Sequence, residues 1–245
     1  MNNPVGSIGI NLISTLIGGL IVYIYTNRNE LKNILLLKCK YRNQDIRASI
    51  SYLFRIENEG KYLLVKNRKI TEQYQPVGGV YKYYDSAGTI FAKLGVKKFS
   101  GYTHEERYKN DLRVKVPSKN LNKFITWFHS REDRELDPIR EFVEELIEPN
   151  FISIDAFAYF NYRFIRQVTT PIKYTQHFNC NEILIYNIYE LLPNGKQKRE
   201  LDKMMETENE NYKWVNLEEI ERLGHNEEAE CRIGEHTKHT IWVKN

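Results

Sequence analysis

The sequence predicts an α+β domain with a mixed β-sheet and flanking helices, preceded by a single transmembrane helix. Three observations predict this arrangement: an uncharged apolar run near the start, several aromatic and β-branched runs, and an acidic amphipathic helix between those runs. A chain of 245 residues, 41% of them hydrophobic, is long enough for one sizeable core and an appendage. We divide it into a transmembrane helix (1–26), a juxtamembrane linker (27–45), a domain (46–223) and a C-terminal tail (224–245).

Composition narrows the classes of partner. The formal net charge of +4 is small, and acids are mixed with the Lys and Arg residues, so a nucleic-acid polymer is not favoured as a partner. The three cysteines are odd in number and far apart, which is typical of a reducing compartment.

The first apolar run, Val5 to Tyr25, contains no charged residue and matches the about 20 residues that cross a bilayer as a helix. A core helix would show a polar face and a secretory signal a basic start, and the run has neither. No Lys or Arg precedes it, whereas residues 28–47 are rich in both, so the N-terminus is expected outside and the bulk of the chain in the cytoplasm. Ser14 and Gly18 put small residues on one helix face, which lets helices approach closely.

Alternating apolar residues from Ile46 to Ile56 predict a half-buried first strand. A turn at 57–60 and a strand at 61–66 complete a hairpin, and a short strand surrounds Gly78 and Gly79. Beyond the acidic helix we predict strands at 152–168, 182–191 (closed by a turn at 193–195) and 212–215, and a last helix at 217–223.

The acidic helix is expected to begin with Asp137 as cap and Pro138 in the first turn, and to end at Pro149 after about three turns. Its apolar stripe comprises Ile139, Phe142, Val143, Leu146 and Ile147. The opposite side carries Arg140, Glu141, Glu144 and Glu145. Three close carboxylates repel each other unless they are solvated, paired with Arg140 or neutralised by a divalent metal. A solvated helix face is the alternative to a metal site.

The spacing of these charges resembles the signature box of the Nudix hydrolase family. Seven residues separate Glu132 from Arg140-Glu141-Phe142-x-Glu144-Glu145, as in the family's Gly, five residues, Glu, seven residues, Arg-Glu-apolar-x-Glu-Glu-x-Gly. Thr126 and Ile147 occupy the places of the two box glycines. Pro76-Val77-Gly78-Gly79 resembles the Pro-Gly-Gly turn that precedes the box in this family, so residues 80–131 form an insertion.

The resemblance implies a chemistry for the box. Glu144 and Glu145, with Glu141, would hold magnesium, while Glu141 serves as metal ligand or base and Arg140 orients it. These residues would make the chain a magnesium-dependent hydrolase of a nucleoside diphosphate derivative.

Further candidate contacts lie outside the box. Tyr162, Arg163, Arg166, Lys173 and His177 offer cations and an aromatic ring to a phosphate-bearing ligand, the alternative being an edge strand with solvated charges. The tyrosines of the insertion offer stacking surfaces for bases, the alternative being ordinary packing. Cys231, His236 and His239 lack the fourth ligand that a structural zinc site needs.

A membrane anchor joined to such a domain, with the segments 162–166 and 169–173, resembles the SMODS-associated Nudix proteins of bacterial CBASS antiphage systems. The resemblance implies a nucleotide-binding effector of antiviral defence in the inner membrane. Its domain would sense a cyclic oligonucleotide, and its transmembrane segments would assemble as a homo-oligomer, disrupt the membrane and cause abortive infection. We favour this effector over the membrane-tethered hydrolase, because a hydrolase gains nothing from an anchor that slows its diffusion.

Overall fold

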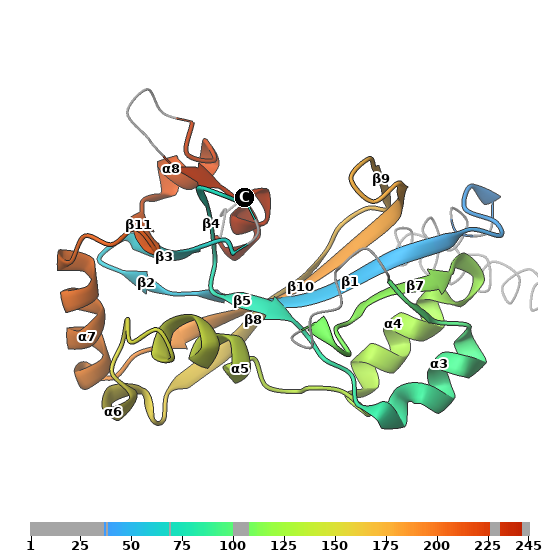
Figure 1. Cartoon of the computed structure of the whole chain (residues 1–245), viewed down its shortest axis with the longest axis horizontal. Coiled ribbons are helices and arrows are strands. Elements are labelled where there is room, and N and C mark those ends of the chain that lie inside the picture. The colour runs from blue at the N-terminus through green and yellow to red at the C-terminus, as the bar shows by residue number, and fades with distance from the viewer. Residues whose placement is uncertain (1–36, 38, 69, 100–107, 226–230, 242–245) are drawn as a thin grey trace, which may run out of the picture.

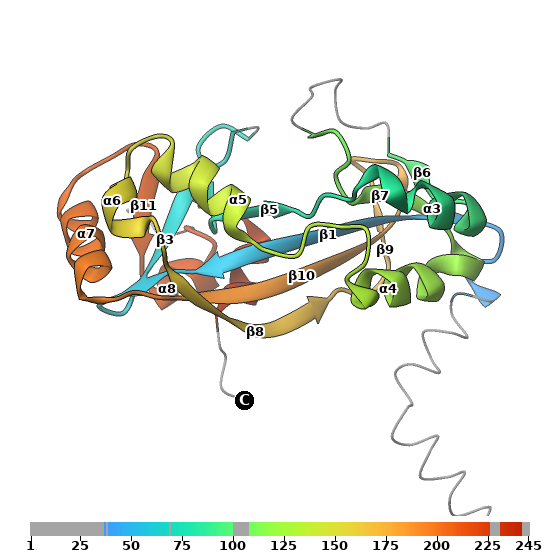
Figure 2. The same ribbon diagram turned by 90° about the horizontal axis from the view of Figure 1, so that it is seen from below.

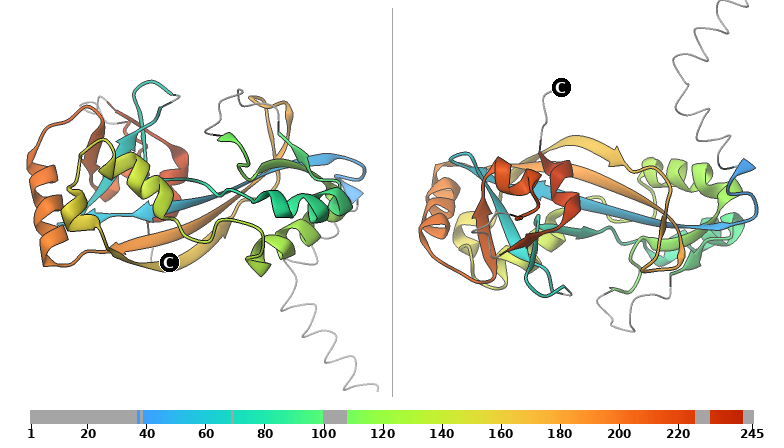
Figure 3. Two further views of the ribbon diagram at one scale, coloured as in Figure 1. Left: turned by 60° about the horizontal axis from the view of Figure 1, so that its bottom comes forward. Right: turned by 90° about the horizontal axis from the view of Figure 1, so that it is seen from above.

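Two long neighbouring strands organise the fold, β1 (Asp45–Arg55) and β10 (Cys180–Leu192), and they pair in parallel (Figure 1). The computed structural model describes residues 37, 39–68, 70–99, 108–225 and 231–241. Helices and shorter strands gather at both ends of this pair (Figures 2 and 3). The α+β class with mixed sheets and flanking helices is therefore confirmed.

The transmembrane run predicted at 5–25 lies outside the described residues. Within them, no helix is both long enough and apolar enough to cross a membrane.

The larger sheet has the order β6-β7-β1-β10-β8, with β5 paired to β1 and β9 to β10. Its further strands are β5 (Gly78–Val80), β6 (Lys97–Lys98), β7 (Arg113–Pro117), β8 (Asn161–Thr169) and β9 (Lys173–Thr175), all joined by antiparallel pairing. The prediction that β1 is half-buried was wrong, because residues on both of its faces are buried. Arg47, Ser49 and Leu53 on one face are buried like Ile46 and Ile50 on the other.

The smaller sheet has the order β11-β3-β4-β12, with β2 paired to β3. Its strands are β2 (Glu57–Asn58), β3 (Lys61–Lys66), β4 (Gln73–Gln75), β11 (Tyr212–Val215) and β12 (Arg232–Ile233). The predicted hairpin exists, but β2 rather than β1 is the partner of β3. Glu59 and Gly60 both take positive φ angles, 49° and 76°. These two residues alone form the turn, which was expected to span 57–60.

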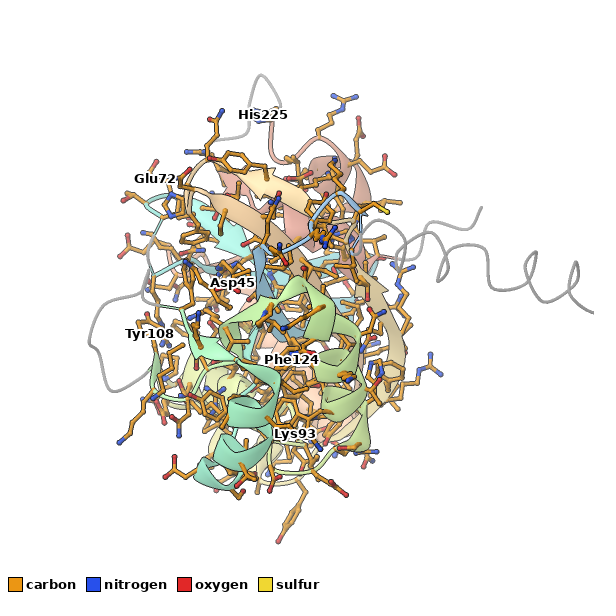
Figure 4. All side chains as sticks on the ribbon, turned by 90° about the vertical axis from the view of Figure 1, so that its right-hand side faces the viewer. Asp45, Glu72, Lys93, Tyr108, Phe124 and His225 are labelled. Atoms are coloured by element: carbon orange, nitrogen blue, oxygen red, sulfur yellow. The ribbon has the colours of Figure 1, made fainter. Side chains whose placement is uncertain are left out.

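The insertion at 80–131 builds one end of the molecule. It supplies β7 and two helices, α3 (Gly88–Leu94) and α4 (Leu121–Ser130), which carry Lys93 and Phe124 in Figure 4. Phe91 of α3 contacts Phe124 and Trp127 of α4, with ring centroids 6.0 and 4.9 Å apart. Tyr81, Tyr83 and Trp127 are buried in this core, so packing is the role of these aromatic residues.

The opposite end holds α5 (Ile139–Phe142), a π-helical turn (Val143–Ile147), α6 (Ile154–Phe157), α7 (Gly195–Glu206) and α8 (Leu217–Glu221). The strand predicted at 152–168 was wrong in its first half. Ser153 Oγ accepts a hydrogen bond from the Asp155 N–H at 3.2 Å and starts α6, so β8 begins only at Asn161.

Helix α7 was missed because its start looks like a turn. Asn194, within the turn predicted at 193–195, accepts hydrogen bonds from the N–H groups of Lys196 and Gln197, and the Gln197 side chain accepts one from the Asn194 N–H. This reciprocal pair is a capping box.

Packed structure continues past both expected domain boundaries. Beyond residue 223, Cys231, Ile233 and Ile241 are buried against Leu64 of the smaller sheet and Ile220 of α8. At the other end Leu37 and Tyr41, within the expected linker, are buried in the core that contains α3 and α4.

The capping box gives the first prediction. Asn194→Ala removes the oxygen that accepts two helical N–H groups and is expected to lower the free energy of unfolding by about 1 kcal/mol in urea titrations. Lys198→Ala, an exposed change on the same helix, is the control and should stay within about 0.5 kcal/mol of the parent. Equal losses in the two variants would contradict the cap.

Candidate functional site

The acidic helix is shorter and wider than predicted. Asp137 does not cap it, because its Oδ1 instead accepts a hydrogen bond from the Tyr162 hydroxyl at 2.8 Å. After α5 the backbone widens into the π turn, where the Glu148 N–H donates to the Val143 carbonyl at 2.9 Å. Phe142 and Leu146 are buried as expected, whereas Ile139 is 39% exposed.

Arg140 is the charge centre of the helix. Its Nη1 lies 2.6 Å from Glu141 Oε1 and 3.3 Å from Glu144 Oε1. Its Nε and Nη2 donate to the two carboxylate oxygens of Glu135 at 3.0 and 3.3 Å, and Nη2 also donates to the Val80 carbonyl at 3.0 Å. The bidentate partner is thus Glu135, not the exposed Glu132 on which the box spacing rested.

The groups around Arg140 favour its charged form. Burial alone would lower the pKa of Arg140, but Tyr52, Glu141 and Glu135 around it together raise that pKa above its ordinary value.

The helix and the two glycines of β5 form one unit. Glu145 is only 8% exposed, and its Oε2 accepts a hydrogen bond from the Gly78 N–H at 2.9 Å. A Cβ on Gly79 would lie 2.1 Å from Glu141 Oε1, and one on Gly78 would lie 2.2 Å from the Tyr52 carbonyl oxygen. Both positions therefore require glycine, because the box side chains and β1 approach the backbone there.

A cleft of about 460 Å³ opens beside this unit, a size typical of small-molecule sites. It brings together acidic, basic and aromatic side chains. They are the carboxylates Asp111, Glu141 and Glu145, the basic Arg68, Arg113 and His177, and the aromatic Tyr108 and Phe178. Tyr108, labelled in Figure 4, comes from the insertion, and Phe178 from the turn between β9 and β10.

Two of the cleft carboxyls have shifted pKa values. Burial raises the pKa of Glu141 above its usual range, even though Arg140 acts to lower it. Burial likewise raises the pKa of Asp111, against the opposing effect of Arg113 at 2.7 Å and Lys82 at 3.3 Å. Such groups are suited to exchange a proton or to be neutralised by a bound cation.

The donor set fits a divalent ion that arrives with its ligand. In the part of the chain that the structure describes, no group of three or more His, Cys, Asp or Glu side chains is placed to hold a metal, and this includes Cys231, His236 and His239. Glu141 and Glu145 face the cleft, whereas Glu144 is paired with Arg140. Magnesium commonly takes one or two carboxylates and completes its shell with water and phosphate oxygens. A magnesium site at Glu141, Glu144 and Glu145 stays a prediction.

Of the five predicted ligand contacts, His177 lines this cleft and the other four do not. Arg163 Nε is 2.5 Å from Glu190 Oε2, and the Tyr162 hydroxyl is used on Asp137. Arg166 Nη2 donates to the carbonyls of His239 and Ile241 at 2.8 and 2.7 Å. Lys173 lines a different cleft. Their role in ligand binding stays a prediction.

Sequence reasoning missed Asp111, Arg113 and Phe178. All three lie far from the box in sequence, and only the pairing of β7 and β10 with β1 brings them near it. Asp111 and Arg113 flank Leu112 at the start of a strand, a pattern that marks two side chains on one face but not what they face.

A family model described as the SMODS-associated NUDIX domain matches residues 45–241. The matched region begins with β1 and includes both sheets and the last helical turn at Glu235–Thr240. Domains of the Nudix type generally use a divalent metal such as magnesium. No curated protein matches the chain.

The raised pKa of Glu141 gives the second prediction. The folded chain binds this proton more tightly than the unfolded chain, so stability decreases as pH rises from about 4.5 through the folded-state pKa. Glu141→Gln is neutral at every pH. In EDTA it should exceed the parent in free energy of unfolding at pH 7 and lose that advantage at pH 4. Urea titrations at both pH values measure this, with exposed Glu132→Gln as the unchanged control.

The contact of Gly79 with Glu141 gives the third prediction. Gly79→Ala forces the Glu141 carboxylate away from Arg140 and should cost about 1–3 kcal/mol of unfolding free energy, as overpacking does. Gly88→Ala is the matched control, since a Cβ there meets nothing within 4 Å. A Gly79 variant as stable as the control would show that the Glu141 side chain does not pack tightly against Gly79.

Proposed function

The chain belongs to the SMODS-associated NUDIX family, and on that premise we propose that it is the membrane effector of a CBASS antiphage system. A cyclic oligonucleotide made during infection binds the Nudix-like domain. The transmembrane helices of several copies then assemble, disrupt the inner membrane and cause abortive infection.

The observation that carries the proposal is the mixed character of the box cleft. Arg68 and Arg113 suit phosphate oxygens, and Tyr108 and Phe178 offer ring faces to a base. Glu141 and Glu145 suit a magnesium ion shared with those phosphates. This combination supports a nucleotide as the ligand.

The bonding of the box carboxylates favours binding over cleavage. Glu141 and Glu144 share one nitrogen of Arg140, and Glu145 is hydrogen-bonded to the backbone of Gly78. Glu145 therefore holds the helix against β5, while Glu141 and Glu144 balance the charge of Arg140. The competing hydrolase is supported by the raised pKa of Glu141, which suits a general base, and it predicts that the nucleotide is recovered cut.

Two hydrogen bonds join the domain to the segment that follows the predicted anchor. The Tyr41 hydroxyl donates to the Ile172 carbonyl at 3.2 Å, and Asn181 Nδ2 donates to Gln44 Oε1 at 2.7 Å. The segment that follows the predicted anchor is thus fixed to the strands that carry the clefts. A ligand that binds one assembly state more tightly shifts the equilibrium, and tethering in a membrane raises the local concentration of the partners.

Liposome leakage separates the two functions. With cyclic nucleotide present, Gly18→Glu should abolish dye release, because it puts a charge on the small-residue face of the anchor, while nucleotide binding persists. Asn3→Glu adds the same charge ahead of the apolar run and is the control. Glu144→Gln combined with Glu145→Gln should leave leakage largely unchanged at a nucleotide concentration that saturates the variant, because no bond is cut.

The opposite pattern would restore the hydrolase. Leakage that survives Gly18→Glu but disappears in the Glu144 and Glu145 double variant would mean that bond cleavage, not helix assembly, drives the output.

A further inference from the structure

The box cleft is one part of a longer groove. A middle cleft of about 270 Å³ shares Gly78, Gly79, Arg113 and Phe178 with it. A far cleft of about 570 Å³ shares Glu182, Leu184, Tyr186 and His236 with the middle one. The three are therefore continuous over the face of the larger sheet where β1, β5 and β10 lie side by side (Figure 1).

The middle cleft contains two fixed guanidinium groups. Arg47 is 2% exposed, is paired with Glu182, and stacks with the rings of Phe99 and Phe178, 4.8 and 4.2 Å from their centroids. Arg113 is held by Asp111. Both guanidinium groups line the same cleft as the backbone of Gly78 and Gly79, and together they offer two cations to a phosphate group.

The far cleft has an aromatic wall. Tyr186 lies 5.3 Å from the ring centroid of His239 and is nearly parallel to His236, at 11° and 6.1 Å. Burial lowers the pKa of His236 to about 4 and also lowers that of His239, so both rings are neutral at pH 7. Neutral aromatic rings with Lys173 beside them match a base and its phosphate.

Arg166 holds that wall in place. By donating to the carbonyls of His239 and Ile241, it fixes the last helical turn against β8 and β10. It is a positioning residue of the far cleft, whereas Lys173 lines the cleft itself.

We propose that the far cleft is a second nucleotide subsite, so that the groove takes a ligand of two or more linked nucleotides. One nucleotide lies at the box, the next lies against Tyr186, and the linking phosphate lies between them at Arg47 and Arg113. The identity of the ligand rests on the proposed function. A mononucleotide fills only one cleft, and this makes the groove selective for an oligonucleotide.

Calorimetric titration of the full chain in detergent, with cyclic di-AMP, cyclic tri-AMP and AMP as probes, tests the subsite. Tyr186→Ala should weaken binding of the cyclic probe about 10-fold or more, the effect of losing one stacked base. Binding of AMP at the box should stay within about twofold. Tyr186→Phe keeps the ring and should bind like the parent, and His239→Leu removes the opposite ring as an independent variant.

Three outcomes would contradict the second subsite. Parent-like affinity for the cyclic probe in both Tyr186→Ala and His239→Leu would overturn the second subsite and leave the sensing function standing. An equal loss for AMP and the cyclic probe would mean that Tyr186 only supports the fold, which also overturns it. A folded parent that binds neither cyclic probe would remove the sensing function and the subsite together.

Discussion

The site depends on the contacts of the Arg140 guanidinium. This group pairs with Glu135, Glu141 and Glu144 and donates a hydrogen bond to the Val80 carbonyl. Three carboxylates this close would repel each other without a cation among them. A charge group of this kind is costly to desolvate, and removing Arg140 would leave the three carboxylates without their shared counter-charge. Its geometry also explains the glycines of β5, because the Glu141 side chain occupies the space in which a Cβ of Gly79 would stand.

The long parallel pair of β1 and β10 forms the floor of the groove that begins beside this cluster. Each strand extends past the box to the far cleft, and separate cores at the two ends hold the pair in place. One core contains the insertion helices and the buried Tyr41, and the other contains Phe142 and Leu146 of the box helix. A nucleotide bound along the groove, as we propose, would touch elements anchored in both cores, including the core that contains Tyr41.

Effector and hydrolase draw on the same residues but use their charges differently. A hydrolase needs its carboxylates to face a metal and the reacting phosphate. Here Glu145 bonds to the Gly78 backbone, Glu141 and Glu144 pair with Arg140, and Asp111 pairs with Arg113. That distribution suits a site that retains a nucleotide, with the output delivered elsewhere in the chain.

The sequence by itself determined the α+β class, the family, the positions of β5, β10 and β11, and the place of the box, because these follow from local periodicity and turn chemistry. Its prediction for residues 5–25 lies outside the described structure. Only the tertiary structure decided that Glu135 pairs with Arg140, that residues on both faces of β1 are buried, and that Asp111, Arg113 and Phe178 join the box. These are contacts between segments far apart in the chain, and no spacing rule within one segment encodes which distant strand will lie beside it.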